Sequence, residues 1–258
     1  MSPGAPDSPG PEGANVGQEG ANAEREEVER FRAVRSRLLE RIASACSRTG
    51  RPAAGVTLVA VTKTVPAERI RGAIQAGFTI LGENRVQEAA PKIADLARER
   101  ASWHLIGPLQ SNKAARAVEL FDVVETVDSI ALAGRLDRLA AGRGRAEVPV
   151  LLEVNVDADP GKSGYDVDRV EADLARLADL PRLRLLGLMT VGRLVTDPED
   201  ARPTFRRLRE LSERLQAREP RLGSALSMGM SDDFEVAVEE GATIVRLGRA
   251  IFGERPVP

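Results

Sequence analysis

The sequence contains few of the residues that form covalent or metal-bound sites. Of its 258 residues, one is a cysteine, Cys46, and one is a histidine, His104. A single cysteine excludes an intramolecular disulfide, and one cysteine with one histidine excludes a Cys/His metal cluster. A site built only from carboxylates remains open, but no acidic loop of the calcium-binding type is present. We expect no metal site, and we interpret His104, which lies beside Trp103 in an apolar segment, as a core residue.

An excess of charge and a long apolar run are also absent. Lysine and arginine number 37 against 39 aspartates and glutamates, and the formal net charge of -2 gives no general attraction to nucleic acid or to a membrane. No apolar run approaches the roughly 18 residues of a transmembrane helix, and the N-terminus lacks the basic and apolar regions of a secretion signal. We expect a cytoplasmic protein whose partners are small molecules.

The composition that remains is sufficient for one large core, because 42% of the residues are hydrophobic. Residues 1–23 are rich in Pro, Gly, Ala, Asn, Ser and Glu and have little to bury, so they are predicted to be a disordered tail. From Glu24 to Ala45 apolar residues recur at helical spacing, and Gly50 follows as a stop signal. We expect a long N-terminal helix and one folded domain, residues 24–258.

After this helix the chain alternates between apolar strands and amphipathic helices. The predicted strands are 56–63, 78–84, 103–108, 122–129, 148–156, 183–191, 225–231 and 242–248. Mostly apolar strands, each followed by a helical segment, indicate an α/β fold with a parallel sheet covered by helices. Eight repeats favour closure into a single (β/α)8 TIM barrel, and an open doubly wound sheet is the alternative.

The first predicted strand ends in a lysine. Alternation along VTLVAVTK places Val59, Val61 and Lys63 on one face, so Lys63 would lie at the carboxyl end of a core strand, where α/β folds build their sites. The alternative is that Lys63 leaves the core and extends into water. Polar residues or glycines also end the other strands: Glu83, Asn84, Gln110, Asp128, Asn155, Ser231, Arg246 and Gly248.

The last two strand ends carry glycine-rich loops, SMGMSDD (227–233) and RLGRAIFG (246–253). Barrel enzymes often bind phosphate after strands seven and eight, where glycines let backbone amides approach the anion. A lysine that faces such a pocket suggests a ligand with both an aldehyde and a phosphate, and pyridoxal 5'-phosphate fits because a lysine amine forms a Schiff base with it. Simpler alternatives are an ion pair for Arg246 and a helix cap for Ser231.

Several longer motifs carry a family resemblance. They are VAVTK, GENRVQEAAPK, WHLIGPLQSNK, EVNVDADPGKSG, GLMTV, LSMGMSDDFEVAVEEGAT and VRLGRAIFG. Over roughly residues 26–256 the chain resembles the YggS-like pyridoxal phosphate homeostasis proteins. The resemblance implies a barrel similar to the N-terminal domain of alanine racemase, and a role in the balance of cellular vitamin B6 and amino-acid pools.

The resemblance also implies a set of cofactor-binding residues: Lys63, Asn84, Ser231, Arg246, Gly248 and Arg249. Lys63 would hold the cofactor as a Schiff base, Arg246 would face the pyridine nitrogen, and Asn84 would lie near the ring. Ser231 and the amides of Gly248 and Arg249 would hold the phosphate. The chain departs from the family at Arg249, where we expect a small hydroxyl residue, and at Arg85, where many members have an aromatic residue.

Three functions remain open. The first is a monomeric pyridoxal phosphate carrier without catalytic residues, which could pass the cofactor to apo-enzymes. The second is a small racemase that uses Lys63 as its sole base, and the third is a barrel enzyme that forms a Schiff base with a sugar or keto acid. A permanently cationic Arg246 opposite the ring nitrogen disfavours transaminase-like chemistry. The only tyrosine, Tyr165, follows the fifth strand, and we expect it to be a mobile rim residue rather than a catalytic acid.

Overall fold

The computed structural model describes residues 11–96, 101–193 and 195–254. The strands are β1 (Thr57–Val61), β2 (Ile80–Glu83), β3 (Ser102–Leu105), β4 (Val123–Val127), β5 (Val148–Glu153), β6 (Leu183–Met189), β7 (Ala225–Ser227) and β8 (Ile244–Leu247). The helices are α1 (Pro11–Arg48), α2 (Ala67–Gln75), α3 (Val86–Asp95), α4 (Ala114–Leu120), α5 (Ile130–Gly142), α6 (Val167–Ala178), α7 (Arg202–Arg218), α8 (Phe234–Glu239) and α9 (Arg249–Phe252). Short 3-10 turns are η1 (Ala53–Gly55), η3 (Ser111–Lys113) and η4 (Pro198–Ala201).

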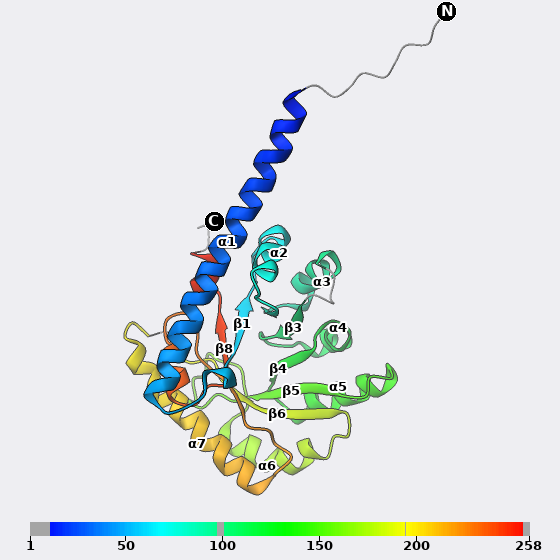
Figure 1. Ribbon diagram of the computed structural model, residues 1–258. Coiled ribbons are helices and arrows are strands. Elements are labelled where there is room, and N and C mark those ends of the chain that lie inside the picture. Colours follow the sequence, from blue (N-terminus) through cyan, green and yellow to red (C-terminus); the bar gives the residue numbers. More distant parts are fainter. Residues whose placement is uncertain (1–10, 97–100, 194, 255–258) are drawn as a thin grey trace, which may run out of the picture.

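The strands form a closed parallel barrel in sequence order. Each strand pairs with the next one, and β1 pairs with β8 to close the sheet, with Val59 opposite Arg246. The helices that follow the strands lie outside the barrel (Figure 1). The predicted (β/α)8 fold is therefore confirmed, and the alternative of an open doubly wound sheet is wrong. Because all strands run in the same direction, their carboxyl ends meet at one mouth of the barrel.

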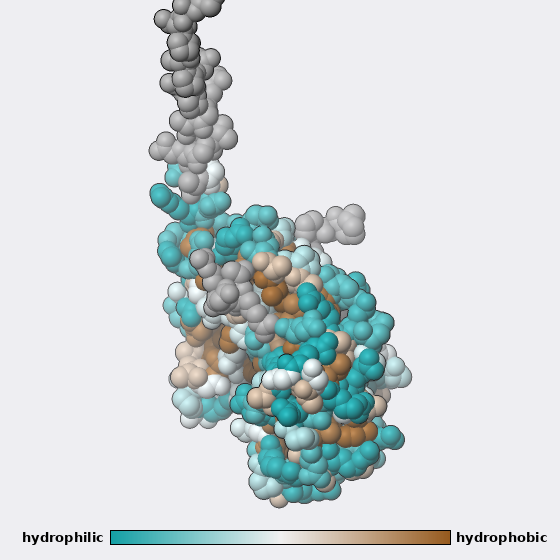
Figure 2. Space-filling model, turned by 90° about the vertical axis from the view of Figure 1, so that its right-hand side faces the viewer, coloured by the Kyte–Doolittle hydropathy of each residue, from teal (hydrophilic) through white to brown (hydrophobic). Residues whose placement is uncertain are grey.

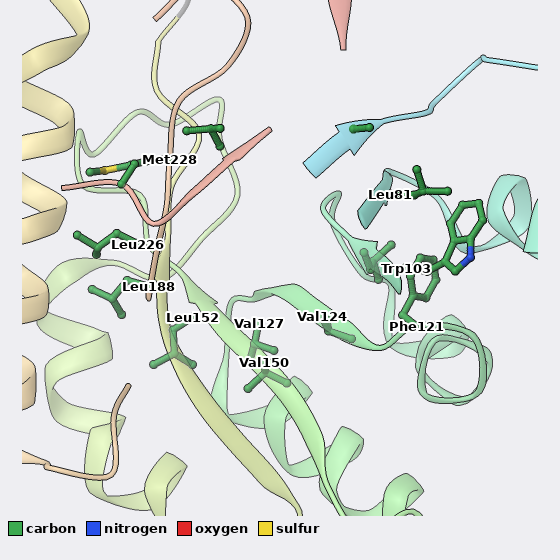
Figure 3. Close-up of a cluster of buried hydrophobic side chains, with 14 of the residues drawn as sticks. Leu81, Trp103, Phe121, Val124, Val127, Val150, Leu152, Leu188, Leu226 and Met228 are labelled. Atoms are coloured by element: carbon green, nitrogen blue, oxygen red, sulfur yellow. The ribbon is translucent and has the colours of Figure 1, made fainter. Parts of the chain in front are cut away.

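Alternation along the strands separates two apolar cores. Side chains that point into the barrel form a small cluster of five buried residues: Val59, Val123, Leu151, Met189 and Ile244. Those that point outward pack against the helices, and Figure 3 shows Leu81, Trp103 and Phe121 close together in this outer layer. All three are fully buried. The inner residues fill the barrel below its mouth, as expected for a packed barrel interior.

Helix α1 is longer than the sequence predicts. It begins at Pro11, not at Glu24, although residues 11–23 include three glycines and two asparagines, which have low helix propensity, and offer little apolar surface. Extending a helix that is already formed needs no new nucleus. Its first buried side chain among the described residues is Val28. Figure 1 shows the N-terminal part of α1 extending beyond the barrel. The rest of the predicted tail, residues 1–10, lies outside the described residues.

The C-terminal half of α1 covers the seam at which the barrel closes. It packs against α2, α8 and α9, the helices that flank β1 and β8 in the sequence. The Phe31 ring packs edge-on against Phe252, with 5.6 Å between ring centroids. This contact fastens α1 to the last helix, directly outside the strands whose ends carry Lys63 and Gly248.

The outer surface is mainly polar. On the face shown in Figure 2, hydrophilic residues surround smaller apolar areas. Within the part of the chain that the structure describes, every helix is too short or too polar to cross a bilayer.

Candidate functional site

A pocket of about 260 Å³ opens at the carboxyl ends of the strands. Its lining consists of Val61, Lys63, Asn84, Ile106, Val191, Arg193, Val195, Met230, Ser231, Asp232, Asp233, Arg246, Gly248 and Arg249. All six residues that the sequence predicts for the cofactor site are in this set. They come from β1, β2, β7 and β8 or the loops that follow them, so closure of the barrel brings together residues that are far apart in the sequence.

Lys63 enters the pocket from β1 in the way that alternation predicts. Val59 belongs to the barrel interior, while Val61 and Lys63 line the pocket two and four residues later. Lys63 thus lies among the residues that line the pocket at the carboxyl ends of the strands.

An ion pair between Lys92 and Glu83 fixes the backbone just before Lys63. Lys92 Nζ on α3 donates to the Thr62 carbonyl over 2.8 Å and to Glu83 Oε1 over 2.7 Å. The Thr62 hydroxyl donates to the same Glu83 oxygen over 2.7 Å. These bonds join the ends of β1 and β2 directly below Lys63 and Asn84. Glu83, expected at the mouth, therefore faces α3 instead of the pocket.

Arg246 lies at the floor of the pocket and continues into a chain of buried polar side chains. Its Nη1 donates to Ser227 Oγ over 2.6 Å and its Nη2 donates to the Thr190 carbonyl over 2.8 Å. Ser227 Oγ donates to Glu125 Oε2 over 2.5 Å, and His104 Nδ1 lies 2.6 Å from Glu125 Oε1. The guanidinium is thus fixed by partners that come from the barrel interior, and His104 is buried as the sequence suggests.

Charge on these groups is balanced inside the barrel. Burial lowers the pKa of Arg246, and the carboxylates of Glu125, Glu153 and Asp233 oppose this effect. Burial would raise the pKa of Glu125, but its hydrogen bond with His104 and nearby positive charges outweigh burial and lower the pKa. Glu125 is therefore ionised and neutralises Arg246 through Ser227.

A second interior carboxyl, Glu153 at the end of β5, is in a different state. Burial raises the pKa of Glu153 to about 7, the nearby charge of Asp128 adds to the rise, and Arg246 opposes it. Among the described residues none is a hydrogen-bond partner of Glu153 Oε2. At neutral pH the barrel interior thus holds one ionised carboxylate and one that is about half protonated.

The other end of the pocket is formed by two loops that contact each other. Ser231 Oγ, after β7, accepts a hydrogen bond from the Ala250 amide over 3.2 Å. Gly248 has φ -112°, which any residue adopts, and a Cβ there would make only ordinary contacts with Val61 at 3.5 Å and beyond. The backbone therefore does not require glycine at 248, and its missing side chain leaves the pocket open to the adjacent amides.

Other residues that the sequence places at the mouth have different roles. Asn155 exchanges hydrogen bonds with the backbone of Asp159, and neither Gln110 nor Asp128 lines the pocket. Arg85 is exposed and pairs with Glu88 over 3.4 Å.

Tyr165 is a core residue and not the mobile rim residue that we expected. It is 2% exposed, its backbone bridges to Val154, and its amide donates to the Glu153 carbonyl over 2.7 Å. Burial raises the pKa of its hydroxyl far above the ordinary value. The loop after β5 folds back so that Tyr165 pairs with Val154. The Gly and polar residues between them give no sign of this pairing in the sequence.

Sequence reasoning missed several residues that shape the site. Val191, Arg193 and Val195 line the pocket from the loop after β6, and nothing in their sequence pattern distinguishes them. For Glu125 and Ser227 a signal exists, since each is a polar residue at an inward position of an otherwise apolar strand. Buried polar groups in such positions need partners, which points to an interior network.

Comparison with known proteins agrees with this architecture. Residues 35–256 match a family model described as "Alanine racemase, N-terminal domain". The "Pyridoxal phosphate homeostasis protein" of Aquifex aeolicus is 42% identical over 220 residues, which cover 85% of this chain and 96% of that protein. The protein of the same name from Escherichia coli K12 is 40% identical over 222 residues, covering 84% and 93%.

A solved structure supports the same assignment. PipY of Synechococcus elongatus, described with PLP bound, superimposes with a TM-score of 0.74 at 42% identity, covering 83% of this chain and 99% of that one. The resemblance seen in the sequence motifs is thereby confirmed. The chain belongs to the alanine racemase N-terminal domain family, among the pyridoxal phosphate homeostasis proteins.

Proposed function

We propose that this chain binds pyridoxal 5'-phosphate in the pocket at the barrel mouth and serves in vitamin B6 homeostasis. The observation that carries the proposal is that three kinds of group line one pocket. They are the amine of Lys63, the buried guanidinium of Arg246 and, at the other end, the hydroxyl of Ser231 beside Gly248. PipY, a relative at 42% identity, is described with PLP bound. When bound, pyridoxal phosphate supplies an aldehyde that condenses with a primary amine, on a ring whose phosphate is an anion.

The residues present fit this molecule from end to end. Lys63 offers the primary amine, and the Ser231 hydroxyl with the amides of Gly248 and Arg249 offers donors for a phosphate. Val61, Ile106 and Met230 provide apolar walls for a ring. Arg246 can only donate hydrogen bonds, so at the ring nitrogen it would keep that nitrogen unprotonated and hold the ring without activating it.

The test is covalent labelling of a lysine. Purified protein mixed with pyridoxal phosphate is reduced with borohydride, and peptide mass mapping locates the reduced adduct. We expect wild-type protein to carry the adduct on Lys63 and Lys63→Ala to lose both the adduct and the visible absorption band. Lys162→Ala is the matched control, because Lys162 Nζ donates to the carbonyl of pocket residue Val191 over 3.0 Å without lining the pocket itself.

The labelling result can reject the assignment. If the adduct of wild-type protein maps to a lysine other than Lys63, or if Lys63→Ala remains coloured and reducible, the cofactor site is elsewhere.

We also propose that the bound cofactor is not turned over. Two-base racemisation needs an acid/base group on each face of the substrate α-carbon. Tyr165, the only tyrosine, is buried outside the pocket. Of the two pocket carboxyls, Asp233 Oδ1 accepts from the Met230 amide over 2.6 Å, and Asp232 lies beside Ser231 at the end of the pocket that would hold the phosphate.

Racemisation is the second candidate function, favoured by the match to the alanine racemase N-terminal domain. Deuterium exchange at the α-carbon of L-alanine separates the two. We expect exchange no faster than with free pyridoxal phosphate. Exchange that is much faster, and that disappears in Lys63→Ala, would make the protein an enzyme. Cytoplasmic location, a monomeric state and delivery of the cofactor to apo-enzymes are further parts of the carrier proposal.

A further inference from the structure

The side chain of Arg249 occupies the boundary between two pockets. Besides the cofactor pocket, it lines a neighbouring pocket of about 240 Å³, which shares Val61, Lys63 and Gly248 with the first. The guanidinium pairs with Asp232, a residue of the cofactor pocket, and its Nη1 lies 3.4 Å from Glu254 Oε1, a residue of the neighbouring pocket. Arg249 therefore connects a carboxylate on each side of the boundary.

This ion pair lies beside the hydroxyl end of the pocket. Ser231 and Asp232 are adjacent, as are Arg249 and Ala250, and the two segments face each other. The Ser231 hydroxyl accepts from the Ala250 amide, and Asp232 accepts from the Arg249 guanidinium. The guanidinium is thus held one residue away from Ser231, within the reach of a side chain that has several rotatable bonds.

The charges around this position are unusual for an anion site. Lys63, Arg193 and Arg246 line the pocket as cations, but the Asp232 carboxylate stands next to Ser231, where a phosphate would be repelled. Arg249 neutralises that carboxylate. The pair is nonetheless exposed, with side-chain exposures of 45% for Arg249 and 55% for Asp232, so solvent weakens it.

We propose that the Arg249 guanidinium exchanges Asp232 for the phosphate of the ligand, so that Arg249 selects phosphorylated over unphosphorylated pyridoxal while Asp232 competes for the same guanidinium. The inference rests on the proposed function. A phosphate dianion accepts two parallel hydrogen bonds from a guanidinium and carries more charge than a carboxylate, so it displaces an exposed ion pair.

The competition limits affinity and assists release. While the ligand is bound, Asp232 has lost its cationic partner and lies close to the phosphate. When the phosphate leaves, Asp232 regains Arg249. A pair of this kind gives the chain a phosphate site that discriminates between ligands without holding the preferred one too tightly.

The test compares dissociation constants for pyridoxal phosphate and pyridoxal, which have the same aldehyde and ring but differ in the phosphate. For Arg249→Ala we expect affinity for pyridoxal phosphate to fall by about tenfold and affinity for pyridoxal to change less than about twofold, because only the phosphate contact is lost. Arg249→Lys keeps the positive charge but lacks the paired donors of a guanidinium, so its affinity for pyridoxal phosphate should lie between those of wild type and Arg249→Ala. For Asp232→Asn we expect pyridoxal phosphate to bind about threefold more tightly.

Arg206→Ala is the matched control, since Arg206 is an exposed arginine that pairs with Glu240 and lies outside both pockets. Melting temperatures confirm that the variants are folded. Equal losses for both ligands in Arg249→Ala, or weaker binding of pyridoxal phosphate by Asp232→Asn, would overturn the proposal, because the pair would then act only as a structural clamp. Failure of the wild-type protein to bind pyridoxal phosphate at all would instead reject the proposed function.

Discussion

Arg246 and Ser227 meet at the floor of the pocket, where Nη1 of the arginine donates to the serine hydroxyl over 2.6 Å. The Ser227 hydroxyl in turn donates to Glu125, which comes from β4 and is fully buried. A buried guanidinium needs a negative partner, and here the partner acts through a hydroxyl. The orientation of Arg246 thus depends on Ser227 and Glu125, which lie outside the pocket lining.

The first prediction concerns removal of this negative charge. Glu125→Gln leaves Arg246 buried without its ionised partner, so we expect the free energy of unfolding at neutral pH to fall by about 3 kcal/mol. Ser227→Ala, which removes hydrogen bonds but no charge, should cost about 1–2 kcal/mol. Urea unfolding measures both. Glu213→Gln changes an exposed glutamate on α7 and serves as the control. A Glu125→Gln protein as stable as this control would show that Glu125 does not support Arg246.

The second prediction is a pH dependence set by Glu153. Its pKa is raised from 4.5 to about 7 in the folded protein, so the folded state binds the proton more tightly than the unfolded state does. The stabilisation is fully present below pH 4.5 and is lost as the pH rises through 7, to a total of at most about 3 kcal/mol. Glu153→Gln cannot lose a proton, so its stability should exceed that of wild type above neutral pH and should approach it in acid.

Urea unfolding of wild type and Glu153→Gln across this pH range measures the difference between them. Other groups contribute equally to both proteins and cancel. If the difference between the two proteins stays constant from pH 4.5 to pH 8, Glu153 has an ordinary pKa and is in contact with water.

The barrel and the position of Lys63 at its mouth could be predicted because both depend on local patterns. Apolar alternation identifies each strand. Because side chains alternate between the two faces of a strand, Lys63 shares a face with Val59 and Val61, and this places it at the mouth without knowledge of the other strands. The pairing of Glu125 with Ser227 joins residues 102 positions apart and follows only from the closed geometry of the barrel. Tyr165 and the start of α1 were misjudged because both predictions relied on polar composition. The loop after β5 nevertheless packs against its strand, and α1 extends over residues that offer little apolar surface.

The third prediction tests the support below Lys63 and Asn84. Lys92→Met removes the amine that binds both Thr62 and Glu83, and leaves the Glu83 carboxylate buried without its cation. We expect unfolding to become easier by about 3–5 kcal/mol. In the double variant Glu83→Leu/Lys92→Met the unpaired charge is gone, so much of this loss should be recovered.

The same variants report on the site. If the ion pair positions the ends of β1 and β2, the double variant should bind pyridoxal phosphate more weakly than wild type even where its stability has recovered. Unchanged affinity in the stable double variant would show that the strand ends are held without Lys92.

The last prediction concerns the N-terminal part of α1. Residues 20 and 22–26 are exposed, and Val28 is the first buried side chain of the described part of this helix. Glu27, which bonds to Arg69 over 3.0 Å, and Phe31, which packs on Phe252, both follow this segment. We therefore expect deletion of residues 1–23 to change the free energy of unfolding by less than about 0.5 kcal/mol. Cofactor binding should stay unchanged.

Phe31→Ala is the comparison within the same helix. Phe31 is fully buried at the seam of the barrel, so its truncation should cost about 3–5 kcal/mol. Thermal and urea unfolding of both variants therefore locate the point at which α1 begins to stabilise the barrel. A loss on deletion of residues 1–23 that approaches that of Phe31→Ala would mean that the N-terminal part of the helix docks on the protein, since an exposed helix that only extends away from the barrel has no buried surface to lose.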